Sequence, residues 1–112
     1  CREIIDEIAH EENLAFKLGL ISADIDKGIV HSALEKGHVQ PLKYVPVLSR
    51  SDIDTAVHIV AQMGTEPLIK ALSQGCDVIL AGRCYDPAVF AALPIYKGYD
   101  PGLATHLGKI LE

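Results

Sequence analysis

Residues 57–81 read VHIVAQMGTEPLIKALSQGCDVILA, and this stretch decides the fold class. The β-branched run 57–62 predicts a strand. Thr65 and Pro67 predict the start of a helix, because Thr is a favoured N-cap and Pro fits the first turn. Gly75 then ends that helix, and the apolar run 77–81 predicts a second strand. A strand, a helix and a strand in this order predict a parallel pair joined by a crossover.

The flanking sequence extends this α/β pattern in both directions. The apolar run 15–21 predicts a third strand that is covered on both faces. The two prolines of 38–50 mark a connection with room for a short edge strand. Periodic apolar positions and start signals predict further helices over 2–12, 26–36, 86–93 and 100–111. We therefore expect a three- to four-stranded, mainly parallel sheet with flanking helices.

Length and composition limit the class of protein. The chain has 112 residues, 49% of them hydrophobic, and a formal net charge of −5. This favours one α/β domain over 1–112, or a domain fragment of a longer polypeptide, because the last helix reaches Glu112 without a stop signal. The acidic balance argues against nucleic acid as a partner, and the short apolar runs argue against a membrane span. Three cysteines without disulfide spacing favour the cytoplasm.

Three loops follow the predicted strands at their carboxyl ends. They cover residues 22–26, 62–66 and 82–86, and each contains charged or hydrogen-bonding residues. In open parallel sheets ligands bind beyond the carboxyl ends of the strands. The sequence therefore places the candidate ligand site at these loops.

The loop Gly82-Arg83-Cys84-Tyr85-Asp86 carries the clearest binding signal. Gly82 lets a ligand approach the backbone, and Arg83 next to a helix N-terminus suits a carboxylate or phosphate. Gly82 and Arg83 are therefore candidate substrate-binding residues, and Asp86 is a candidate catalytic acid or base. Alternatively, Arg83 pairs with Glu66 or Asp86 across the loops, and Asp86 caps its helix.

The loop before Pro67 repeats this arrangement. Gly64 is a further candidate for substrate binding, and Glu66 is a candidate general base. The alternative for Glu66 is a first-turn acid that complements the helix dipole. His106 on the last helix is the third catalytic candidate, because it alone among the histidines follows the strand that ends at Ala81.

Metal and cofactor signals are weak. Asp24 and Asp26 form an Asp-x-Asp pair that could hold a divalent cation, but helix capping and solvation explain both residues more economically. Neither GxGxxG nor GxxxxGK[ST] occurs. We therefore assign no metal site, and the cofactor stays unknown.

Several segments together resemble a known family. They are Val60-Ala-Gln-Met-Gly-Thr-Glu-Pro67, the stretch from Ala71 to the Ala-Gly-Arg83 motif, Asp86-Pro-Ala, and His106-Leu-Gly-Lys-Ile-Leu-Glu112. This pattern resembles the acyclic terpene utilisation (AtuA-like) family, most closely over 57–112 and more loosely over 1–50. Cys76 stands where that family usually has Ala.

The resemblance implies an α/β domain of a cytosolic bacterial protein. The family is associated with the catabolism of branched acids or their CoA thioesters, and it offers no firm reaction to carry over. Its recurrent positions correspond to Gly64, Glu66, Gly82, Arg83, Asp86 and His106. Since family members are several hundred residues long, the resemblance also implies that the rest of a parent chain is a partner and completes the site.

Two functions from different classes remain open. In the first, a fragment of a catabolic enzyme binds a small anionic substrate through Arg83, with Glu66 or Asp86 in acid–base catalysis. In the second, a non-catalytic ligand-binding or assembly domain, which could form a homo-oligomer, uses the same charges only to hold its loops together. The two differ in whether Arg83 opens onto a cleft or is sealed in a salt bridge.

Overall fold

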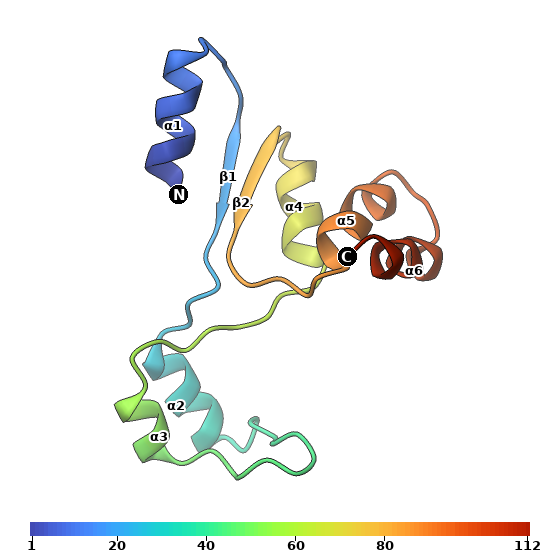
Figure 1. The fold of residues 1–112 in the computed structure, drawn as a ribbon. Helices are drawn as coiled ribbons and strands as arrows, with labels where there is room; N and C mark the ends of the chain where they lie inside the picture. The colour runs from blue at the N-terminus through green and yellow to red at the C-terminus, as the bar shows by residue number, and fades with distance from the viewer. The chain divides into compact units, whose positions relative to one another are not determined.

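A computed structural model describes residues 1–112 and shows a mixed α/β chain with six helices and one two-stranded parallel sheet (Figure 1). The predicted α/β class with parallel strands is therefore confirmed. The elements are α1 (Arg2–Glu11), β1 (Leu18–Ile21), α2 (Lys27–Glu35), α3 (Arg50–Thr55), α4 (Glu66–Ser73), β2 (Val78–Ala81), α5 (Ala88–Tyr96) and α6 (Pro101–Leu111).

The chain divides into two compact units. Unit 1 comprises residues 1–22 and 62–112, and unit 2 comprises residues 23–61. Unit 1 contains the sheet with α1, α4, α5 and α6, whereas unit 2 contains α2 and α3.

The sheet of unit 1 consists of β1 and β2 in parallel, with Leu18 opposite Val78 and Ile21 opposite Ala81. The backbone N–H of Gly82 continues this ladder by donating to the Ile21 carbonyl oxygen at 2.8 Å. Both strands therefore end at the same edge of the sheet, as the sequence predicts for parallel strands.

The predicted strand at 57–62 is not formed, and the sheet has two strands rather than three or four. The only strand-like pairing of this segment is an isolated antiparallel bridge between Val60 and Asp24. Val57 is 86% exposed and Val60 is 54% exposed. A β-branched sequence favours a strand mainly through packing of its side chains, and these side chains have little to pack against. Residues 38–50 likewise contain no strand.

The core of unit 1 lies between the sheet and α4, with α5 packed next to α4 (Figure 1). Gly19 allows close packing, because a Cβ atom at this position would lie 3.0 Å from the Cys76 Sγ and 3.6 Å from the Ala71 Cβ. The buried cluster comprises Leu68, Cys84, Ala88 and Ala92, and the side chains packed against it are Ile21, Met63, Ile69, Leu72, Ile79 and Ala81. Small residues on α5 thus let this helix approach α4 closely.

Most predicted helix ends are confirmed by capping hydrogen bonds or by the backbone angle of a single residue. The Asp26 side chain accepts a hydrogen bond from the Gly28 N–H at 2.8 Å, and Asp100 accepts from the Leu103 N–H at 2.8 Å. Gly75 ends α4 with a φ of +77°, a conformation that glycine adopts without steric cost. Thr65 occupies the N-cap position of α4, but its side chain makes no capping hydrogen bond.

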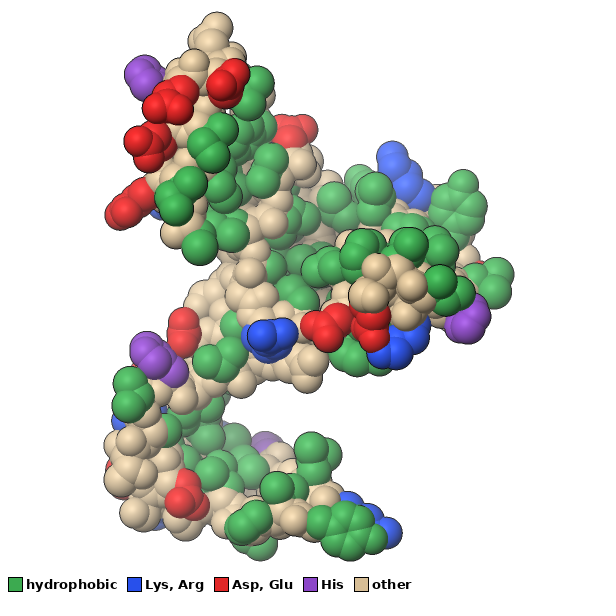
Figure 2. All heavy atoms as spheres, in the orientation of Figure 1, with side chains coloured by type: hydrophobic (Ala, Val, Ile, Leu, Met, Phe, Trp, Pro, Cys, Tyr) green, Lys and Arg blue, Asp and Glu red, His purple; other side chains and the backbone are tan.

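The helix α1 keeps the predicted amphipathic pattern. Figure 2 shows acidic side chains along one side of α1 and hydrophobic side chains along another. None of its residues is buried, and Ile4 and Ile8 are 58% and 49% exposed. The acidic run of α1 is thus a solvated helix face.

In unit 2, polar contacts connect α2 with the segment that contains α3. The His31 Nε2 atom lies 2.8 Å from Asp54 Oδ1, and the Lys27 Nζ donates to the Asp54 carbonyl oxygen at 2.8 Å. Arg50 forms an ion pair with Glu35. Ile53 is only 1% exposed and supplies the apolar centre of this unit.

A capping box at the start of α3 sets a pH dependence. The Asp52 carboxylate accepts hydrogen bonds from the Ser49 hydroxyl at 2.6 Å and from the Ser49 N–H at 2.8 Å. These bonds, the hydroxyl bond first, hold the pKa of Asp52 below its ordinary value of 3.8. Because the folded-state pKa is depressed, the stabilisation is complete above the unfolded pKa and is lost as the pH falls through the folded pKa.

We expect Ser49→Ala to raise the pKa of Asp52 toward 3.8, since the strongest of its hydrogen bonds is lost. An NMR titration of the Asp52 carboxyl carbon measures this shift. Ser51→Ala is the matched control, because the Ser51 side chain makes no hydrogen bond to Asp52. Equal Asp52 pKa values in the two variants would contradict the role of the capping box.

Candidate functional site

A cleft of about 720 Å³ opens in unit 1 at the carboxyl end of β2. Its walls come from α4, from β2 and the loop that follows it, and from α5. Among the predicted site residues, Gly82, Arg83 and Asp86 line this cleft. The loop that the sequence singles out at the end of a parallel strand thus lines a cavity.

Backbone pairing fixes the loop after β2. The Met63 N–H donates to the Arg83 carbonyl oxygen at 3.0 Å, and the Tyr85 N–H donates to the Met63 carbonyl oxygen at 2.8 Å. Cys84 is buried between these contacts, and its thiol donates to the Gly82 carbonyl oxygen at 3.4 Å. Because the backbone is held on both sides of Arg83, its side chain extends from a fixed point at the cleft.

The charges of the cleft are one cation and one anion. The Arg83 Nη1 atom lies 3.7 Å from Asp86 Oδ1, and the two side chains are 64% and 68% exposed. This distance exceeds that of a charge-assisted hydrogen bond, so the pair is a loose surface contact. Arg83 is therefore open to the cleft and is not sealed in a salt bridge, and it pairs with Asp86 rather than with Glu66.

Asp86 does not cap α5, which corrects the capping alternative. The N-cap position of α5 is Pro87, and no side chain caps this helix. The Asp86 carboxylate instead faces Arg83 at the cleft. Pro87 is fully buried and itself occupies the N-cap position, so α5 starts one residue later than an Asp86 cap would require.

Gly64 and Glu66 lie together, but they do not line the cleft. A Cβ atom on Gly64 would lie 2.7 Å from the Glu66 Oε2 atom, so the Glu66 side chain folds back over Gly64. Glu66 is exposed in the first turn of α4. This position agrees with the alternative in which Glu66 complements the helix dipole.

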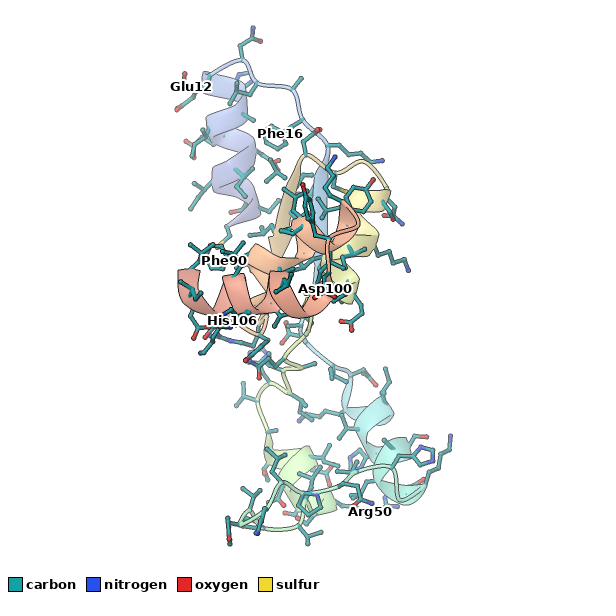
Figure 3. All side chains as sticks on the ribbon, turned by 90° about the vertical axis from the view of Figure 1, so that its right-hand side faces the viewer. Glu12, Phe16, Arg50, Phe90, Asp100 and His106 are labelled. Carbon is teal, nitrogen blue, oxygen red and sulfur yellow. The ribbon has the colours of Figure 1, made fainter.

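His106 is exposed on α6 and does not line the cleft either. Figure 3 shows His106 on α6, the helix that packs against α5 through its buried residues Ala104 and Gly108. His106 lies two positions from each of these residues, which is about 200° around a helix. Its imidazole is therefore directed away from the face that packs on α5.

The sequence matches one known family. The sequence model of the acyclic terpene utilisation family protein AtuA matches residues 1–109. The chain belongs to the AtuA family. No curated protein and no solved structure matches it. In addition, none of its helices combines the length and the apolar composition that a membrane crossing requires.

The apolar walls of the cleft were missed by the sequence reasoning. Leu68 and Leu72 of α4 face the cleft together with Val89 and Leu93 of α5. Each pair is four residues apart, so each marks one helix stripe. The four-residue spacing is visible in the sequence of this AtuA family chain. It does not show, however, that the two stripes line a cavity.

The residues proposed for a metal lie in unit 2. Asp26 caps α2, which confirms its capping interpretation, and Asp24 Oδ1 lies 3.4 Å from His58 Nδ1. No group of three or more histidine, cysteine, aspartate or glutamate side chains is placed to hold a metal ion in this AtuA family chain.

Proposed function

We propose that this AtuA family chain acts in the utilisation of acyclic terpenes by binding an anionic small molecule of the branched-acid or acyl-CoA type. The site is the cleft at the carboxyl end of β2. The observation that carries the proposal is Arg83, an exposed guanidinium at a largely apolar cavity of about 720 Å³. Cavities of about 300–1,000 Å³ with a few polar groups are typical of small-molecule sites.

In this proposal Arg83 binds the anionic group and Gly82 lets the ligand approach the backbone. Asp86 is the one acidic side chain of the cleft, so it is the acid or base nearest to a bound ligand. Glu66 and His106 would act on this ligand only with the rest of a parent chain in place. The reaction of the catabolic enzyme remains unassigned, and the three free cysteines favour the cytoplasm.

The proposal also includes a larger sheet. In a two-stranded sheet, β1 and β2 each keep one edge without a partner. Isolated strand pairs of this size are marginal in water, and unpaired edges bind further strands. We expect further strands of a parent chain to extend this sheet to the three or four strands that the sequence pattern favours.

The second candidate is a non-catalytic domain in which Arg83 and Asp86 only hold the loop in place. The ion pair between these residues favours it. An exposed ion pair contributes only between 0 and about 1 kcal/mol to stability, however. The pair therefore does little to hold the loop in place.

The substitution Arg83→Gln separates the two candidates. We expect it to weaken ligand binding at least about tenfold, as loss of a charge-assisted contact does. The measurement is a thermal-shift titration with 5-methylhexanoate and with its CoA thioester. Ligand at a hundred times its Kd adds about 2.7 kcal/mol of apparent stability.

Arg2→Gln is the matched control, because Arg2 is 66% exposed and also forms an ion pair with an aspartate, here Asp6. Under the second candidate Arg83→Gln leaves the response to both probes unchanged and changes only the midpoint of unfolding. That result would remove the small-molecule proposal.

A further inference from the structure

We infer that the ligand of the cleft is a free monocarboxylic acid with a short hydrocarbon chain, and that its carboxylate replaces Asp86 on Arg83. This inference rests on the proposed function. It goes further by choosing the free acid over the CoA thioester, and by giving Asp86 the role of an internal competitor for the binding site.

The charge of the cleft sets the class of ligand. Among the lining residues, Arg83 is the only cation and Asp86 is the only anion. One guanidinium matches one carboxylate, to which it donates two parallel hydrogen bonds. A coenzyme A thioester carries several phosphate charges and has a neutral carbonyl where the free acid has its carboxylate. A cleft with one cation therefore suits the free acid.

The ion pair between Arg83 and Asp86 is weak enough for a ligand carboxylate to replace Asp86. Its closest atoms are 3.7 Å apart, and both side chains are about two thirds exposed, at 64% and 68%. Asp86 has no capping contact at α5 that would hold it in this position. A ligand carboxylate can therefore take over Arg83 while Asp86 turns into solvent, which costs little because an exposed pair is weak.

The apolar walls give the ligand an advantage over Asp86. The cleft is lined by Leu68 and Leu72 of α4 and by Val89, Ala92 and Leu93 of α5. Val89 and Leu93 are 54% and 50% exposed, so a bound hydrocarbon chain would cover apolar surface that is now in water. Burial of this surface favours binding, and a carboxylate without a hydrocarbon chain lacks the gain.

The test is isothermal titration calorimetry of the chain with three probes, namely 5-methylhexanoate, its primary amide and its CoA thioester. We expect the acid to bind at least about tenfold more tightly than the other two, because only the acid satisfies Arg83. Arg83→Gln should remove this preference. Asp86→Asn should tighten binding of the acid about threefold, as expected when a weak competing ion pair is lost.

Arg2→Gln and Asp6→Asn are the matched controls, since they break an exposed arginine–aspartate pair on α1, and they should leave all three affinities unchanged. If Arg83→Gln fails to fold, Arg83→Lys keeps the charge without the two parallel hydrogen bonds and should give an intermediate affinity.

Each contrary result has a distinct meaning. If the thioester binds more tightly than the acid and still requires Arg83, the inference is wrong and the proposed function stands. If Asp86→Asn weakens binding of the acid, Asp86 contacts the ligand and is no competitor. If no probe binds, or if Arg83→Gln has no effect, the proposed function and this inference both fail.

Discussion

Ile53→Ala is expected to lower the free energy of unfolding by about 2–5 kcal/mol, the usual cost of truncating a buried isoleucine. Ile53 is 1% exposed on α3 and is the most deeply buried side chain of unit 2. In contrast, α2 contains no buried residue. Ile53 is therefore the only buried residue of the two helices of this unit, and its loss leaves a cavity that the polar contacts cannot fill.

Urea denaturation followed by circular dichroism measures this effect. Ile29→Ala is the matched control, because Ile29 lies on α2 of the same unit and is 65% exposed. We expect this control to cost less than about 1 kcal/mol, as surface substitutions usually do. Equal losses for the two variants would show that Ile53 is not the centre of unit 2.

The comparison of 57–62 with 77–81 shows what the sequence can predict about this fold. Both segments are apolar and β-branched, yet only the second forms a strand, β2. The sheet pairs β2 with β1 and leaves Val57 almost fully exposed at 86%. Local propensity is similar in the two segments, so the difference arises from packing partners that a single sequence does not reveal.

Helix ends were easier to predict because their signals are local. The turn after α4 needs a residue with positive φ, and Gly75 supplies it. The cap of α2 needs an acceptor for the Gly28 N–H, and Asp26 supplies it. The start of α5 differs from this expectation, because the buried Pro87 occupies the N-cap position and Asp86 makes no capping contact.

The same distinction applies to the candidate site. Arg83 and Asp86 line the cleft, and the sequence pattern singles out their loop because it follows the end of a parallel strand. His106 was not brought to the cleft, because its position on α6 is set by the contact of Gly108 with α5. That contact joins two helices and has no signature within either of them.

Gly108→Ala is therefore the second substitution with a large expected effect, a loss of about 1–3 kcal/mol from overpacking. A Cβ atom at this position would lie 2.5 Å from the Pro87 carbonyl oxygen and 3.1 Å from the Pro87 Cβ. Pro87 is among the fully buried side chains, and its carbonyl oxygen already accepts hydrogen bonds from the Phe90 and Ala91 N–H groups. Backbone on both sides leaves no flexible atom to move, so α6 must shift away from α5.

Gly102→Ala is the matched control on the same helix, because its Cβ would meet only the end of the Asp100 side chain, at 3.1 Å. There the helix preference of Ala over Gly, about 0.5–1 kcal/mol, offsets the small adjustment of Asp100. Urea denaturation should place Gly108→Ala well below this control. Because Pro87 follows Asp86 directly, Gly108→Ala should also disturb the edge of the cleft and weaken binding of 5-methylhexanoate. A Gly108→Ala variant as stable as Gly102→Ala would show that α6 does not pack on α5 through this glycine.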